Sequence, residues 1–93
     1  PTQFALGQNF PNPFNPTTQI TYSLAEEGRV HLVVYNLLGQ VVRDLVEEYR
    51  TAGSHAIVWD GKDASGRAVA SGIYIYRIEA SRFSAVRRMV LLK

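Results

Sequence analysis

A chain of 93 residues with a net charge of +2 and no cysteine is long enough for one domain with a single modest core. The absence of cysteine excludes disulfides and thiolate metal sites, but it leaves secretion open because a sufficient core needs neither. No apolar run approaches the roughly 20 residues of a membrane-spanning helix, so we expect no membrane insertion. The chain opens Pro1-Thr2-Gln3 without an initiator methionine or a signal-peptide pattern, so we expect a piece of a longer polypeptide.

Residues 1–17 form a lead-in that is rich in proline and asparagine. Three Asn, three Pro and two Phe follow one another within eight of its residues. Proline removes backbone donors and keeps the preceding residue out of the α region, which excludes a helix. Large aromatic side chains also distinguish the segment from a flexible Gly/Ser linker. We expect a stiff, turn-rich segment in which Asn12 and Asn15 form Asx turns, while Phe10 and Phe14 anchor it to a core.

Short segments of alternating polarity, separated by turn signals, follow the lead-in. In the first of them Ile20, Tyr22 and Leu24 alternate with polar residues, which indicates a strand with one dry face and one wet face. Turn signals recur roughly every 8–12 residues, a spacing typical of a sandwich. The expected strands are Gln19–Leu24, Val30–Val34, Gln40–Val46, His55–Trp59, Ile73–Ala80 and Phe83–Leu92, with a short bridging strand that begins at Val69.

The segment Gln40–Val46 is the most ambiguous of these. Its apolar residues also fit helical spacing, and Glu47-Glu48 are good helix formers. The adjacent valines and the preceding hairpin loop, in which Gly39 is suited to a positive φ, favour a strand. Because its alternation is imperfect, we expect either a bulge or an edge position.

These elements predict an all-β fold, an immunoglobulin-like antiparallel β-sandwich of about seven strands. Its largest buried side chains should be Phe14, Trp59, Tyr74 and Tyr76. Arginines are frequent from Arg77 onward, but they alternate with apolar residues. This pattern fits a solvated strand face better than an arm that binds nucleic acid, and the neighbouring tyrosines have core parity.

The sequence offers no constellation for catalysis, so we expect no enzyme, no cofactor and no metal site. The sequence has no Gly-x-Ser-x-Gly elbow that would present a nucleophilic serine to His31 or His55. Neither histidine has a partner at the i, i+4 spacing of helical metal ligands. His31 should face solvent, and His55 should lie at the rim of the core. The loop Asp60–Gly66 fails the EF-hand pattern, although an irregular calcium site there stays open beside the simpler interpretation that Asp60 and Asp63 form Asx turns.

A set of motifs covers nearly the whole chain. They are the Asn-Pro-Phe-Asn-Pro run at 12–16, Val-Tyr-Asn-Leu-Leu-Gly at 34–39, Trp-Asp-Gly at 59–61, Ser-Gly-Ile-Tyr at 71–74 and Arg-Met-Val-Leu-Leu-Lys at 88–93. In this order they resemble the type A C-terminal sorting domains of the type IX secretion system. That family is related in turn to the immunoglobulin-like domain of flagellar hook-capping proteins.

The resemblance implies a non-catalytic sorting signal at the C-terminus of a larger secreted protein. It implies that the domain folds in the periplasm and is read by the outer-membrane translocon. A sortase-like protease would then remove it in many cargo proteins and attach the passenger to the cell surface. In such families the last strand carries the signal, so the candidate recognition residues are Arg88, Met89, Val90, Leu91, Leu92 and Lys93. Of these we expect Leu91 to be partly buried, and Arg88 and Lys93 to point to water. The alternative is a structural or carbohydrate-associated accessory module beside a secreted enzyme, because fold alone does not choose between these functions.

Overall fold

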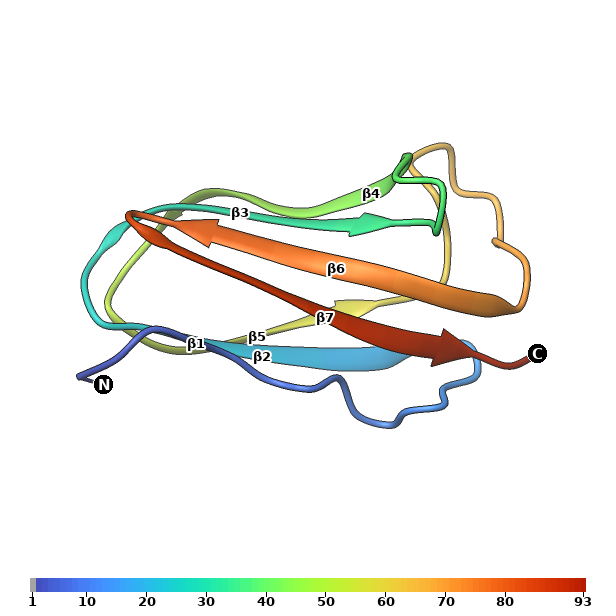
Figure 1. Cartoon of the computed structure of the whole chain (residues 1–93), viewed down its shortest axis with the longest axis horizontal. Coiled ribbons are helices and arrows are strands. Elements are labelled where there is room, and N and C mark those ends of the chain that lie inside the picture. The colour runs from blue at the N-terminus through green and yellow to red at the C-terminus, as the bar shows by residue number, and fades with distance from the viewer. Residues whose placement is uncertain (1) are drawn as a thin grey trace.

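Seven antiparallel strands in two facing sheets account for most of residues 2–93, which the computed structural model describes (Figure 1). The smaller sheet has the order β1-β2-β5 and the larger one the order β4-β3-β6-β7. The strands are β1 (Ala5–Leu6), β2 (Thr18–Leu24), β3 (Gly28–Tyr35), β4 (Val41–Arg50), β5 (Gly53–Trp59), β6 (Gly72–Ala80) and β7 (Phe83–Leu91). None of the described residues belongs to a helix that is long and apolar enough to cross a membrane.

The core lies between the two sheets because each long strand turns one face inward. The residues of β2 alternate between buried and more exposed positions, and those of β6 do the same. The four large side chains expected inside are buried, with exposed fractions of 2% for Phe14, 0% for Trp59, 8% for Tyr74 and 0% for Tyr76. The Trp59 ring meets Tyr74 edge-on at 5.5 Å and Phe14 at 5.7 Å between centroids, which are favourable aromatic geometries.

The ambiguous segment is a strand, and it is longer than expected. β4 pairs with β3 along its whole length and continues to Arg50 instead of stopping at Val46. The predicted irregularity is present as two register shifts, one opposite Leu32/Val33 and one opposite Val34/Tyr35. Each shift inserts a residue into β4, which explains why its apolar residues do not alternate cleanly. Between β3 and β4, Gly39 has the expected positive φ, 81°.

Two expectations about short elements are wrong. The lead-in contains a strand that its sequence does not signal, because Ala5 and Leu6 pair with the far end of β2 as β1. Val69 begins no strand: its backbone N–H donates to the Gly61 carbonyl at 3.0 Å, and the neighbouring pairing is the isolated bridge between Lys62 and Ala68. Pro1, the first residue of the expected lead-in, lies outside the described residues.

The lead-in packs on the sandwich through different side chains from those expected. Phe14 is a buried anchor, but Phe10 is 69% exposed, so its predicted anchoring role is wrong. The side chain of Asn12 accepts a hydrogen bond from the distant Val90 N–H instead of closing an Asx turn. Asn9 is only 2% exposed, although its side chain is polar and has no apolar surface that would favour burial. The segment is therefore held to the domain by polar contacts as much as by aromatic burial.

Candidate functional site

The end of β7 presents two different faces. Met89 and Leu91 point into the core and are fully buried. Arg88 and Lys93 are exposed, as expected, and so is Leu92, at 53%. Leu91 was expected to be only partly buried, and that expectation is wrong. The candidate residues 88–93 thus combine two side chains that secure the strand with others that a partner could reach.

The lead-in covers the outer edge of the same part of β7. Figure 1 shows the blue N-terminal segment near the red final strand, and the backbone contacts make this proximity specific. Phe14 N–H donates to the Val90 carbonyl and Leu92 N–H donates to the Phe14 carbonyl, both at 2.9 Å. Gln8 Nε2 donates to the Arg88 carbonyl at 2.7 Å. A sheet edge that would otherwise offer unpaired backbone groups is therefore capped from Arg88 to Leu92.

A buried polar cluster fixes the lead-in in this position. The Tyr76 hydroxyl donates to the Gly7 carbonyl at 2.7 Å and accepts from the Asn9 N–H at 2.9 Å. The Asn9 side chain donates in turn to Thr18 Oγ1 at 3.0 Å and to the Pro11 carbonyl at 3.2 Å. Buried polar groups that are all paired hold a segment in one geometry. Sequence reasoning missed this cluster because the hydrogen-bonded residues come from three separate segments.

The solvent-facing side of the β6–β7 pair carries apolar and basic side chains together. Cross-strand partners on it are Ile73 with Val90, Ile75 with Arg88, and Arg77 with Val86. Val86 is 56% exposed and Ile73 is 39% exposed. Surface of this mixed kind, unlike a purely charged strand face, is suited to contact with another macromolecule.

The Asp60–Gly66 loop uses its carboxylates for its own backbone. Asp60 Oδ1 accepts from the Lys62 N–H at 3.1 Å, and Asp63 Oδ1 accepts from the Ser65 N–H at 3.0 Å. These are the Asx turns expected from the sequence. The Ser65 hydroxyl and the Arg67 N–H also donate to Asp63 and lower the pKa of its carboxyl. Within residues 2–93, the three-donor group that could hold a metal ion is elsewhere, at His31, Asp44 and Glu47.

The two histidines lie in different environments. His55 is half-buried, stacks on Tyr22 at 5.3 Å between ring centroids, and contacts the Thr51 carbonyl through Nε2 at 2.8 Å. This is the core-rim position expected for it. His31 lies on the outer face of β3, where its Nε2 contacts Asp44 and Glu47. Neither ring is hydrogen-bonded to a serine in the part of the chain that the structure describes, as a nucleophile–base pair would be.

Comparison with models of known protein families identifies the family of this β-sandwich. Residues 12–84 match the model of the FlgD Ig-like domain. The chain belongs to the FlgD Ig-like domain family. The crystal structure of FlgD from P. aeruginosa agrees, with a TM-score of 0.63 and 28% identity over 80% of this chain and 57% of that chain. The fold is therefore the expected immunoglobulin-like one. Comparison with curated protein sequences gives no match.

Two solved proteins of Porphyromonas gingivalis contain a similar domain. Dimeric latent PorU aligns with a TM-score of 0.75 and 18% identity, over 91% of this chain and 9% of that chain. PorZ is described as an essential bacterial surface component of the type IX secretion system. It aligns with a TM-score of 0.60 and 18% identity, over 97% of this chain and 11% of that chain. At this identity the likeness shows the fold alone, and this chain spans only about a tenth of either protein.

Proposed function

We propose that this chain is a non-catalytic sorting domain that directs a covalently linked upstream passenger across the bacterial outer membrane through the type IX secretion system. Its partners would be the outer-membrane translocon and a sortase-like protease. It would pass through the periplasm and be released or remain at the cell surface with its passenger. The order of sequence motifs from the lead-in to the terminal Arg-Met-Val-Leu-Leu-Lys supports this proposal, and so does the similarity in fold to a domain of PorZ.

The observation that carries the proposal is that residues 88–93 combine buried apolar side chains with exposed basic ones. Met89 and Leu91 hold the end of the chain in the core, while Arg88 and Lys93 extend into water. A core gains nothing from two terminal cations, but a receptor with an acidic surface would. The lead-in occupies the backbone edge of the same segment. Recognition of the folded domain would therefore use side chains and not the addition of a strand at this edge.

The accessory-module alternative rests on the same fold, but it predicts that function does not depend on the position of the domain in the polypeptide. A spacer or carbohydrate-associated module would work at any position in a polypeptide, whereas a sorting signal of this type must end it. The exposed Ile73 and Val86 are compatible with either function. Whether Lys93 ends the natural polypeptide is therefore the observation that separates the two proposals most simply.

A reporter fused upstream of this domain and produced in a bacterium with type IX machinery tests the proposal. The parent fusion should reach the medium or the cell surface. Deleting residues 89–93 would remove the buried Met89 and Leu91, so the deletion confuses signal with folding. The informative variant is Arg88→Glu with Lys93→Glu, which changes only exposed side chains. We expect this double variant to fold and to accumulate in the periplasm.

A matched control makes the same charge change at the opposite end of the sandwich. Arg29 and Arg82 are exposed. Arg82 lies in the turn between β6 and β7, and Arg29 precedes Val30, which pairs with Ala80 at the end of β6. Figure 1 shows this end of the sandwich opposite the C-terminus. Arg29→Glu with Arg82→Glu should be exported like the parent. Equal export of both double variants would exclude a signal read through charge in the last strand. Failure of the parent fusion to leave the periplasm would favour the accessory module.

A further inference from the structure

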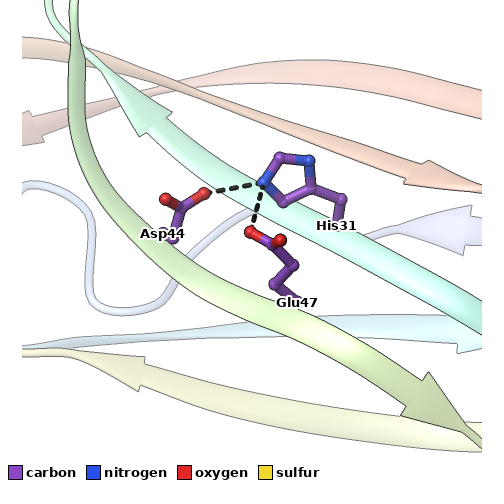
Figure 2. Close-up of side chains that lie close together, drawn as sticks. All are labelled: His31, Asp44 and Glu47. Atoms are coloured by element: carbon purple, nitrogen blue, oxygen red, sulfur yellow. Dashed lines mark hydrogen bonds and ion pairs between the residues drawn. The ribbon is translucent and has the colours of Figure 1, made fainter.

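One imidazole and two carboxylates converge on the outer face of the β3–β4 pair. Figure 2 shows His31 projecting from β3 toward Asp44 and Glu47 of β4, with its ring nitrogen facing both. His31 Nε2 lies 2.7 Å from Asp44 Oδ1 and 3.4 Å from Glu47 Oε2. The donor atoms of the three residues all lie within 4.8 Å of one another. All three side chains are about half exposed, so an ion could enter from solvent.

A β-bulge brings the two carboxylates to the same face. Residues 44 and 47 are three apart, and in a regular strand they would point to opposite sides of the sheet. Glu47 is directly opposite His31, whereas Asp44 is opposite Val33, because the register shift inserts Leu45 into β4. His31 and Val33 are two residues apart on β3 and share a face, so both carboxylates end beside the imidazole. Bulges that re-aim side chains in this way are frequent next to functional sites.

The cluster also carries negative charge that no arginine or lysine of residues 2–93 balances by a direct ion pair. Asp60 has Arg43 at 3.2 Å, Glu79 has Arg77 at 3.2 Å, and Glu48 has Arg50. Within residues 2–93, the ion-pair partner of Asp44 and of Glu47 is His31 alone.

A second cross-strand neighbour adds to this negative environment. Glu79 of β6 lies opposite His31 on its other side, but Arg77 already holds that carboxylate. Two adjacent carboxylates therefore face one imidazole without a fixed cation. A proton on His31 or a bound divalent ion would satisfy them.

We propose that His31, Asp44 and Glu47 bind one divalent cation of the zinc class, with water completing its coordination. This proposal is independent of the proposed sorting function. An imidazole nitrogen with two carboxylate oxygens suits zinc, whereas calcium takes oxygen ligands only.

The spacing of the donor atoms fits such an ion. Ligand bonds of about 2.05 Å around a tetrahedral ion place donor atoms about 3.3 Å apart. The distance of 3.4 Å between His31 Nε2 and Glu47 Oε2 already fits this value. A small rotation of the half-exposed Asp44 side chain would lengthen the shorter contact of 2.7 Å between His31 Nε2 and Asp44 Oδ1. The site lies on the outer surface, so the domain should fold without the ion.

Isothermal titration of the untagged chain with Zn²⁺ at pH 7.5, in a buffer that does not coordinate zinc, tests the proposal. We expect one ion per chain and no comparable binding of Ca²⁺. Loss of a residue that only hydrogen-bonds to a metal ligand already weakens metal binding about 10–100-fold. His31→Ala or Glu47→Gln removes a ligand itself and should therefore weaken zinc binding at least about tenfold.

Two matched controls separate this site from general surface binding. Glu79→Gln changes the carboxylate on the other side of His31, and His55→Gln changes the other histidine of the chain. Both should bind zinc within about threefold of the parent, since neither removes a proposed ligand. All variants change side chains that are at least partly exposed, and thermal melting verifies that they fold. Zinc binding that is absent in the parent, unchanged in His31→Ala, or lost equally in His55→Gln would overturn the proposal.

Discussion

Removing the hydroxyl of Tyr76 tests the mechanism that attaches the lead-in to the sandwich. Tyr76 is fully buried, and its hydroxyl both donates to the Gly7 carbonyl and accepts from the Asn9 N–H. Tyr76→Phe keeps the ring and its packing, but it leaves two backbone groups without their partner. The lead-in residues should then lose the contacts that fix their geometry, while the core of the two sheets stays intact.

The size of the effect follows from the burial of the two partners. Asn9 is 2% exposed, so its orphaned N–H cannot reach water without local movement and should cost about 1–3 kcal/mol. Gly7 is less buried, and its carbonyl should cost only about 0.5–1.5 kcal/mol. The two costs together give an expected loss of about 1.5–4.5 kcal/mol in the free energy of unfolding. A chain of 93 residues has a total free energy of unfolding of about 5–14 kcal/mol, so this is a large fraction.

Urea unfolding and amide hydrogen exchange measure this prediction, with Tyr74→Phe as the matched control. The Tyr74 hydroxyl makes one hydrogen bond, to the carbonyl of the exposed Ala70 at 2.7 Å, and its loss should cost about 0.5–1.5 kcal/mol. Faster exchange near Gly7 and Phe14 should appear in Tyr76→Phe only. A Tyr76→Phe variant as stable as the parent, or no less stable than Tyr74→Phe, would refute the reasoning.

Trp59→Ala should lower the free energy of unfolding by about 3–5 kcal/mol in urea titrations, because it empties a fully buried site; a change below about 1 kcal/mol would contradict this packing. Burial raises the pKa of the Tyr76 phenol. The unfolded chain therefore loses that proton first, and stability should fall as pH rises above about 10, less steeply in Tyr76→Phe; equal slopes would contradict the assignment. Gly66 has a φ of 86° and open space where a Cβ would lie, so Gly66→Ala should lower the free energy of unfolding by about 1–2 kcal/mol through backbone strain alone. Gly61→Ala should cost more by thermal melting, because its Cβ would also lie 2.9 Å from the Pro16 carbonyl oxygen, and equal costs would count against that close approach.

The long strands could be predicted because their signal is local. In β2 and β6, every side chain that faces the core except that of Thr18 is apolar, and its neighbours are polar or less buried, so a period of two is visible in the sequence. The same logic predicted that Trp59 would be buried. β4 was harder because its two bulges interrupt the alternation, and only its pairing with β3 resolves the choice against a helix.

The lead-in could not be predicted in detail because its contacts are with distant parts of the chain. Asn12 bonds to Val90, which is 78 residues away, and Asn9 bonds to Tyr76, which is 67 residues away. Local rules assign asparagine to turns and phenylalanine to a core, and they fail for Asn12 and for Phe10. The buried polar cluster has no sequence period, since it depends on where the two sheets place the segment.

The cation site likewise needed the three-dimensional register. The sequence shows His31, Asp44 and Glu47 as three separated polar residues, and the usual metal spacings exclude them. A carboxylate pair three residues apart would face opposite ways in an ideal strand. The bulge at Leu45 reverses that expectation, and the imperfect alternation of 41–46 was the only signal of it in the sequence.

The two ends of the chain depend on each other in this domain. The lead-in closes the backbone edge of β7, and the side chains of Met89 and Leu91 complete the core against which Phe14 packs. A truncation at either end should therefore disturb the other, which makes deletion a poor test of a terminal signal. Because the edge from Arg88 to Leu92 is already hydrogen-bonded, a receptor that reads the folded domain must contact the exposed side chains of β7 or first displace the lead-in. Tyr76→Phe separates these two routes: it should leave export unchanged if side chains are read, and enhance export if displacement of the lead-in is required.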